Sequence, residues 1–272
     1  MKNKYKILTI FLLTLFSFMY TNEVATVIRN NDPLMKQIDE VSNEYTIPKL
    51  EPVIMQDEYI TGINGCKIDK KNSYDRMKNN KEFNEELIVM KQDEIENIND
   101  KYIIMGNNKK RNVSIVLTNI ELNDFFVNKK VKVNYFLDGN YVYNNISDLI
   151  KINRGSNIYS FGRNRKYESK YIVYDNTVIN TNFNNKSDYC LLEEKNKDML
   201  ELCSSYKMKT IKANRITNNL LSYTKENLSN GKIFFYDTKD LNQIKISINY
   251  ILSKGYNIVS LDELLNQVND CA

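Results

Sequence analysis

Apolar and polar positions between residues 113 and 142 follow a pattern that predicts a parallel β-α-β unit. An apolar run at 113–117 is followed by a polar turn and a short helix, and a second apolar run covers 131–137. Two strands joined by a crossover of helix length are typical of parallel pairing. The second strand ends at Asp138-Gly139-Asn140, and a helical pattern follows at 143–152. Because sites in such folds gather where strands end, the residues after these strands are the first candidates for a function.

Strand-like and helix-like segments continue to alternate up to the C-terminus. The pattern predicts strands at 156–161, 171–174, a segment ending at 189–190, 209–212, 232–236 and 257–260, and helices at 196–206, 220–228, 241–253 and 261–268. Strands that alternate with helices of about ten residues predict an α/β fold with a mostly parallel sheet. We therefore assign residues 112–272 to one α/β domain.

Residues 26–111 are less regular and predict a small α+β module. Asp32-Pro33 has the residue types of a helix start, and Ser73 is a suitable cap for a short helix at 74–79. Strand-like segments lie at 52–55, 83–90 and 101–105. No arrangement of residues in this module indicates a catalytic site.

The first 25 residues have the pattern of a targeting segment. Lys2, Lys4 and Lys6 precede an apolar run at 7–20, as in a secretory signal. Residues 21–25 contain no small-x-small cleavage pair, so an N-terminal membrane anchor is the alternative. Both interpretations predict an extracytoplasmic protein, either secreted or anchored to the membrane by this segment.

Composition excludes several classes of function. The net charge is +4 over 272 residues without a basic cluster interleaved with aromatics, so we expect no nucleic-acid partner. The chain has no His, which removes the commonest metal ligand and the usual general base near neutral pH. Its four cysteines have no C-x-x-C spacing, which argues against zinc. Cys190 and Cys203 form either a disulfide or two separately buried thiols, and both interpretations remain open.

Three stretches of the α/β domain resemble the NodB-homology domain of polysaccharide deacetylases, carbohydrate esterase family four. VNYFLDGN at 133–140 resembles the family's A-T-F-F-x-x-G strand, and 149–158, which contains Arg154 and Gly155, resembles its L-v-k-x-i-x-x-G-H-e-I-G stretch. SKGYNIVSLDELL at 253–265 resembles the stretch k-x-x-G-Y-k-f-v-t-L-s-e-L-L. The resemblance implies a distorted (β/α) barrel, which this chain would have in a shortened form.

The functional motifs of that family are degenerate in this chain. The family's T-F-D-D-G motif supplies a base and a metal ligand, and the two Asp are replaced here by Thr118 and Asn119. The H-[ST]-x-x-H motif aligns with 159–164, R-x-P-x-G falls near 187–190, and the acid His of L-x-H aligns with Tyr236. The degenerate positions are Thr118, Asn119, Tyr159, Arg163, Tyr189, Tyr236 and Asp237.

Loss of these groups predicts a protein without the family's metal and without any other cofactor. Amide hydrolysis needs an activated water, a polarised carbonyl and a proton for the leaving amine. We therefore expect a non-catalytic envelope protein that binds a cell-wall glycan or an envelope protein. The alternative is an active carbohydrate N-deacetylase with a rebuilt Asp/Tyr site; substitute ligands would come from Asp138, Asp175, Asp188 and Asp237.

Possible ligand contacts lie at or near the predicted strand ends. Aromatic rings stack on sugar faces and tyrosine hydroxyls bond to sugar groups, but packing in the core or at the barrel rim is the alternative for each tyrosine. The candidate residues are Tyr135, Asp138, Asn140, Tyr159 and Tyr236.

Overall fold

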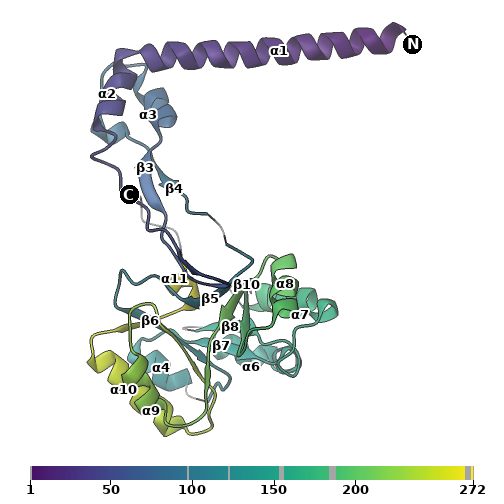
Figure 1. The fold of residues 1–272 in the computed structure, drawn as a ribbon, viewed down its shortest axis with the longest axis vertical. Helices are drawn as coiled ribbons and strands as arrows, with labels where there is room; N and C mark the ends of the chain where they lie inside the picture. Colours follow the sequence, from purple (N-terminus) through teal and green to yellow (C-terminus); the bar gives the residue numbers. More distant parts are fainter. Residues whose placement is uncertain are drawn as a thin grey trace. The chain divides into compact units, whose positions relative to one another are not determined.

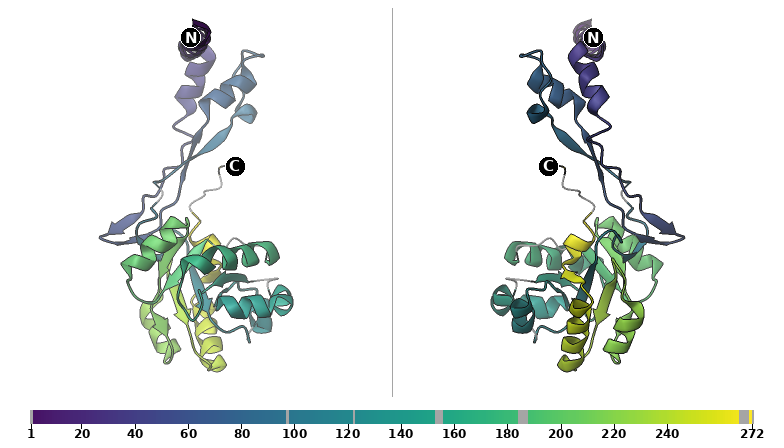
Figure 2. Two further views of the ribbon diagram at one scale, coloured as in Figure 1. Left: turned by 90° about the vertical axis from the view of Figure 1, so that its right-hand side faces the viewer. Right: turned by 90° about the vertical axis from the view of Figure 1, so that its left-hand side faces the viewer.

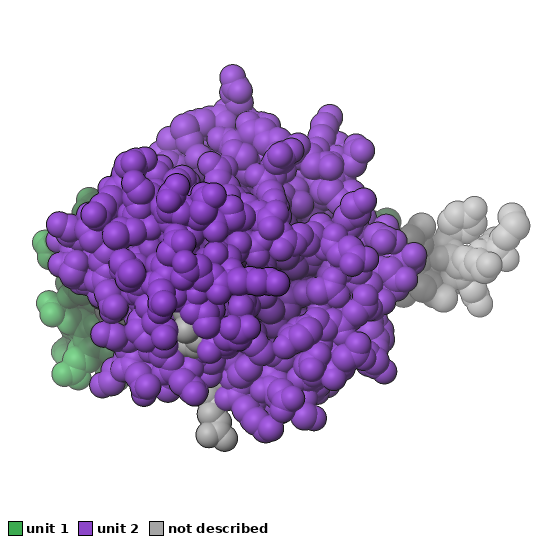
Figure 3. Space-filling model, turned by 90° about the horizontal axis from the view of Figure 1, so that it is seen from below, with its two compact units in different colours: residues 1–49, 64–94, 269–272 green, residues 50–63, 95–268 purple. Residues whose placement is uncertain are grey.

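The computed structural model describes residues 2–96, 98–121, 123–152, 156–183, 188–266 and 271, and for α1 it omits the side chains of residues 2–10, 18–19 and 21–22. Arg154, Gly155, Ser187 and Val268, which entered the sequence predictions, lie outside the described residues. The chain divides into two compact units (Figure 3). Unit 1 comprises residues 1–49, 64–94 and 269–272, and unit 2 comprises residues 50–63 and 95–268.

Unit 1 combines helices with a two-stranded sheet. Its elements are α1 (Lys2–Asn31), α2 (Pro33–Val41), β3 (Gly65–Ile68), α3 (Lys70–Met77), the 3-10 helix η1 (Glu85–Leu87) and β4 (Met90–Asp93). The predicted start of α2 is confirmed, since the Asp32 side chain accepts a hydrogen bond from the Leu34 backbone N–H at 2.9 Å. β3 and β4 pair in antiparallel orientation. Leu34, Ile38, Ile68 and Met77 form a small core.

No helix within the part of the chain that the structure describes has both the length and the hydropathy to cross a membrane.

Unit 2 contains two mostly parallel sheets. One has the strand order β1-β2-β5-β10-β9, and the other has the order β11-β12-β6-β7-β8 with β13 paired to β6. Among the strands that the structure describes, every strand pairing in unit 2 except β1–β2 is parallel. The strands are β1 (Val53–Met55), β2 (Glu58–Ile60), β5 (Tyr102–Met105), β6 (Asn112–Leu117), β7 (Asn134–Leu137), β8 (Asn157–Ser160), β9 (Tyr189–Leu192), β10 (Lys209–Lys212), β11 (Arg215–Ile216), β12 (Ile233–Tyr236) and β13 (Asn257–Val259).

Helices flank these sheets. They are α4 (Asn123–Lys129), α5 (Gly139–Asn144), α6 (Ile146–Ile152), α7 (Ser169–Asn182), α8 (Lys197–Ser205), α9 (Leu220–Asn227), α10 (Leu241–Ser253) and α11 (Leu261–Leu264). Helices α9 and α10 lie side by side next to the six-stranded sheet (Figures 1 and 2). The α/β architecture with a largely parallel sheet is therefore as predicted.

Side-chain alternation along the strands builds two cores in unit 2. Val116, Phe136 and Phe235 point into a cluster shared with β9 and β10. The residues next to them in sequence belong to a second cluster, which includes Ile244 and Ile248 of α10. Because successive side chains of a strand point to opposite faces, each central strand is buried on both sides.

Most predicted elements are present, but two predicted strands are wrong and two further predictions miss their position. The segment expected to end at 189–190 is β9, which begins at Tyr189. Ser73 lies inside α3, which Asp69 caps, instead of capping a helix at 74–79. The two wrong strands are 171–174 and 83–90. Residues 171–174 lie inside α7, where Ile172, Asp175 and Ile179 face inward at helical spacing, rather than in a strand. The strand-like segment 83–90 contains η1, and only its last residue belongs to β4. Both errors come from short apolar runs, whose periodicity does not distinguish a strand from a helix.

The two units do not divide at the predicted position between residues 111 and 112. Residues 50–63 and 95–111 belong to unit 2, because β2 and β5 extend the sheet that contains β10. Cys271, which was expected in the α/β domain, is bonded to Cys66 in unit 1.

Candidate functional site

A cleft of about 570 Å³ lies at the carboxyl ends of the strands of the six-stranded sheet. Thr118 follows β6, Asp138 follows β7 and Asp237 follows β12, so parallel pairing brings the three residues to the same edge of the sheet. The full lining is Thr118, Asn119, Ile120, Glu121, Leu137, Asp138, Tyr141, Arg165, Arg215, Asp237, Thr238 and Lys239. The cleft therefore lies where an α/β fold of this type is expected to carry its site.

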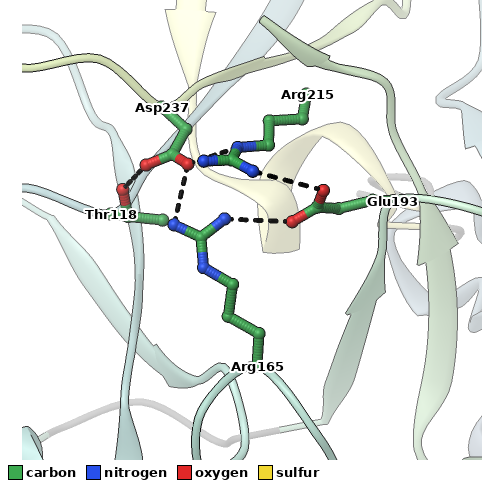
Figure 4. A network of polar contacts seen from close by, with 5 residues as sticks. All are labelled: Thr118, Arg165, Glu193, Arg215 and Asp237. Carbon is green, nitrogen blue, oxygen red and sulfur yellow. Dashed lines mark hydrogen bonds and ion pairs between the residues drawn. The ribbon is translucent and has the colours of Figure 1, made fainter. Parts of the chain in front are cut away.

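Two arginines and two carboxylates form a connected network at this cleft (Figure 4). Arg165 donates to Asp237 Oδ2 at 2.8 Å and to Glu193 Oε1 at 3.1 Å. Arg215 donates from Nε to Asp237 Oδ2 at 2.5 Å, and its Nη1 lies 3.9 Å from Glu193 Oε2. The Thr118 hydroxyl donates to the other oxygen of Asp237. Each carboxylate thus contacts both guanidinium groups.

Asp237 is the least exposed member of the network, with 11% of its side chain accessible. Burial by itself would raise the pKa of this carboxyl. The hydrogen bonds from Thr118 and Arg165 and the charges of Arg165 and Arg215 outweigh burial and hold the pKa of Asp237 below its usual value. Asp237 is therefore an ionised carboxylate with its oxygens already bonded, which makes it a poor general base.

The residues of the cleft do not fit the metal that the family resemblance implies. Thr118 and Asn119 carry no charge, the chain has no His, and Asp237 is paired with two cations. Across the described ranges, no three Asp, Glu, Cys or His side chains come together in a group that could hold a metal ion. We therefore derive no chemical step through a metal.

The predicted polar residues around β6 and β7 lie at or beside the cleft. Asn119 accepts a hydrogen bond from the Glu121 backbone N–H at 2.8 Å. Asp138 caps α5 through the Asn140 backbone N–H at 2.9 Å and also accepts from the Asn164 N–H at 2.6 Å. Asn140 is exposed but does not line the cleft.

Tyrosines proposed as ligand contacts are instead buried. Tyr135 and Tyr159 have no exposed surface, and Tyr236 is 1% exposed. Tyr135 and Tyr236 point into the cluster that contains the α10 side chains. Each is next in sequence to a Phe that points into the other cluster, and successive side chains of a strand point to opposite faces. Tyr159 donates to Asp262 at 3.1 Å. The packing alternative therefore describes all three side chains.

The remaining degenerate positions also have structural partners. Arg163 pairs with the buried Asp175 at 3.2 Å and lies 3.7 Å from the ring centre of Tyr171. Tyr189 is 6% exposed and belongs to the core between the sheets. Neither lines the cleft.

Sequence reasoning missed three members of the network: Arg165, Glu193 and Arg215. Arg165 lies in the loop after β8, Glu193 directly follows β9, and Arg215 begins β11. The sequence did contain a signal for such a network. Charged residues of opposite sign stand at or near strand ends, and the chain has lost the residues of the family's metal-binding motifs. Their pairing was not visible because they are far apart in sequence.

Both disulfides lie inside single units. Cys190 of β9 is bonded to Cys203 of α8, which settles the open alternative in favour of a disulfide. Cys66 is bonded to Cys271 within unit 1, a pair that the sequence did not predict. Two disulfides are typical of proteins outside the cytosol and indicate an extracytoplasmic protein.

Comparisons with known proteins extend the resemblance from motifs to the fold. No protein-family model matches the chain. The uncharacterized protein YlxY of Bacillus subtilis (strain 168) is 28% identical over 143 residues, which cover 48% of this chain and 44% of that protein. The match thus spans less than half the length of this curated relative.

Solved structures show the same architecture. A CE4 family pseudoenzyme from Bacillus anthracis superposes with a TM-score of 0.59 at 18% identity, covering 88% of this chain and 97% of its own. A mutant of that pseudoenzyme with restored enzymatic activity gives a TM-score of 0.57 at 17% identity, covering 87% and 99%. PdaA of Bacillus subtilis, a family 4 carbohydrate esterase, gives 0.51 at 12% identity, covering 60% and 84%. The chain therefore has the polysaccharide-deacetylase fold of carbohydrate esterase family 4.

Proposed function

We propose that this chain is a non-catalytic protein of the polysaccharide-deacetylase fold that binds a glycan of the cell envelope in the cleft of unit 2. The observation that carries the proposal is the network of Arg165, Arg215, Glu193 and Asp237 at the cleft. Two guanidinium groups occupy the end of the sheet where the family resemblance places a cation. The similarity of the fold to a CE4 family pseudoenzyme supports the same conclusion.

The cleft has the size and lining of a small-ligand site. Its volume of about 570 Å³ falls within the range of roughly 300–1,000 Å³ that is usual for ligand pockets. Tyr141 lines it with 42% of its surface exposed, so its ring is available to stack on a sugar face. Leu137 and Ile120 add apolar surface next to the polar groups. A glycan, which has both apolar faces and hydroxyl groups, fits this combination.

The arginines can also donate to a ligand. The side chains of Arg165 and Arg215 are 39% and 40% exposed. Each guanidinium carries five N–H donors, more than its contacts with Asp237 and Glu193 use. A bound sugar could accept from these donors at hydroxyl or carbonyl oxygens without displacing the carboxylates.

The alternative of an active deacetylase with a rebuilt Asp/Tyr site has less support. Asp237 forms ion pairs with two arginines. Burial raises the pKa of Tyr236 above its usual value, so the Tyr236 hydroxyl stays protonated. Tyr236 also shares a 2.6 Å hydrogen bond with Thr224 away from the cleft. Neither group is placed to activate water on a ligand in the cleft.

Within this proposal, the N-terminal segment keeps the protein at the membrane. The apolar run at 7–20 follows three lysines, and the described side chains of Phe11, Leu13 and Phe16 are exposed. Apolar side chains flanked by basic residues favour association with a lipid surface.

Titration calorimetry with N-acetylglucosamine oligomers tests glycan binding directly. We expect measurable binding to the full chain and a loss of about 1–2 kcal/mol of binding free energy in Tyr141→Ala, because the stacking ring is removed. Tyr143→Ala is the matched control, since Tyr143 is exposed but does not line the cleft. Absence of binding to these oligomers and to cell-wall fragments would contradict the proposal and favour a protein partner. Equal losses of binding free energy in both variants would contradict it as well.

A further inference from the structure

A second pocket, in unit 1, gathers cationic side chains from four elements. It has a volume of about 530 Å³ and receives Arg29 from α1, Lys67 from β3, Lys70 and Lys71 from α3 and Lys91 from β4. The other lining residues are Asn30, Met35, Asp39, Ile68 and Asp69. Five cationic and two anionic side chains therefore surround the same space.

Ion pairs neutralise only part of this charge. Lys70 pairs with Asp39 at 2.7 Å, Lys91 with Asp69 at 3.8 Å, and Lys67 with Asp93. Among the described residues, Arg29 and Lys71 have no carboxylate within ion-pair distance. The pocket thus keeps two cations from different helices that form no ion pair. Their charges still reach the Asp75 carboxylate, whose pKa is lowered by its hydrogen bond from Lys78 and then by the charges of Lys78, Lys71 and Arg29. The paired lysines around the pocket are about half exposed.

Phosphate is the anion that such a pocket suits best. An arginine offers a planar pair of N–H donors to phosphate oxygens, and a lysine adds a mobile point charge. The space of about 530 Å³ is large enough to admit a phosphate group together with the organic group that carries it.

The position of the pocket along α1 points to a lipid as the source of that phosphate. Arg29 is nine residues beyond Tyr20, the end of the apolar run, a rise of about 13 Å along a helix. Phe11, Leu13 and Phe16 earlier in the same helix are 62%, 62% and 65% exposed. If these side chains enter lipid, the pocket lies near the level of the lipid headgroups. There it is within reach of the charge of the membrane surface, which salt at 0.1 M screens over about 10 Å.

We propose that this pocket binds phosphate groups of anionic phospholipids at the membrane surface. The inference rests on the proposed membrane location and is independent of glycan binding in unit 2. Its role would be to fix unit 1 against the bilayer, with Arg29 and Lys71 as the contacts to lipid phosphate. Apolar insertion by α1 would supply binding to any bilayer, and the pocket would supply a preference for anionic ones.

Co-sedimentation of the full chain with two kinds of vesicle separates these contributions. One kind is pure phosphatidylcholine, and the other contains phosphatidylglycerol at about one third of the lipid. Binding to the neutral vesicles tests the membrane location, and the additional affinity for the anionic vesicles tests the pocket. We expect that additional affinity to be at least about tenfold and to fall as salt is raised.

Arg29→Gln/Lys71→Gln is the decisive variant. It should lose about tenfold of the affinity for anionic vesicles and keep the affinity for neutral ones. The charge-matched control is Lys36→Gln/Lys81→Gln, which removes two exposed cations of unit 1 that do not line the pocket. Its loss should stay below about threefold, and circular dichroism should show that both variants keep their helices.

Three results would overturn the proposal. The first is equal binding of the full chain to neutral and anionic vesicles. The second is an equal loss in the double variant and its control, which would indicate a diffuse charge effect. The third is displacement from anionic vesicles by inorganic phosphate at millimolar concentration, at matched ionic strength, which would indicate a site for soluble anions.

Discussion

Arg165 and Asp237 form a 2.8 Å ion pair across the mouth of the cleft, between the loop after β8 and the end of β12. Arg215 reaches the same carboxylate from β11. A carboxylate that two arginines share is held in one position and one ionisation state. The strand ends of this fold are therefore cross-linked by charge at the place where a metal would otherwise be expected.

Asp237→Asn should change how the stability of unit 2 depends on pH. The folded-state pKa of Asp237 lies below its usual value, so its stabilising effect is present above about pH 4, the ordinary range of an aspartate, and is lost as the pH falls through the lower folded-state pKa. The asparagine variant should be less stable by about 1–2 kcal/mol at pH 7 and should lack this part of the acid-induced loss.

Urea unfolding at several values between pH 3 and pH 7 measures this difference. Asp240→Asn is not a suitable control, because Asp240 caps α10. Asp148→Asn is suitable, since the Asp148 side chain is exposed and pairs with Lys151 of the same helix. If the wild type and Asp237→Asn lose stability in parallel as the pH falls, the network does not hold the carboxylate as described.

Restoring the two missing aspartates should not restore turnover in this chain. Thr118→Asp would place a second carboxylate against Asp237, to which the Thr118 hydroxyl now donates. We expect this substitution to lower the free energy of unfolding by about 1–2 kcal/mol. Asn119→Asp should be nearly neutral, because a carboxylate can accept the same bond from the Glu121 N–H.

Deacetylase assays and thermal unfolding of both single variants and of the double variant check this expectation. A pseudoenzyme of the same fold has a mutant with restored activity, so the comparison is informative. Here the double variant would still lack histidine ligands and would still have Arg165 at the cleft. Turnover by the double variant would show that the arginine network does not block the site.

The Cys190–Cys203 disulfide should contribute measurably to the stability of unit 2. It joins β9 to α8 across a sequence separation of 13 residues, and loops of this length are associated with about 3 kcal/mol. Cys190→Ala/Cys203→Ala should therefore lower the free energy of unfolding of unit 2 by about 2–3 kcal/mol. Cys66→Ala/Cys271→Ala removes the bridge of unit 1 and is the matched control. Equal effects of the two changes on the unfolding of unit 2, followed by hydrogen exchange at β9 and β10, would contradict this assignment.

Sequence patterns predict the regular elements of unit 2 well where they are long or bounded by clear signals. Helix α10 matches its predicted range, 241–253, because its apolar residues recur at helical spacing and Gly255 adopts a left-handed φ of +75° just after its end. Strand β6 was likewise expected, apart from its first residue. Failures occurred at short apolar runs, such as 171–174, which lie in α7.

Site residues were harder to predict, for two physical reasons. Tyr135 and Tyr236 lie at strand ends, but alternation turns their side chains into the layer between the sheet and the helices. The direction of a side chain depends on register, and a sequence leaves register uncertain by one residue. Arg165 and Glu193 meet only because β8 and β9 end near each other, and this proximity is a property of the tertiary fold.

The most direct test of the account is a search for turnover by the wild-type chain. N-acetylglucosamine oligomers would be incubated with the full chain and added Zn²⁺ or Co²⁺, with and without a chelator, and the products analysed by mass spectrometry. We predict that no deacetylated product forms under any of these conditions, while the same oligomers bind in the cleft. A deacetylated product that appears with the metal and disappears with the chelator would contradict the account.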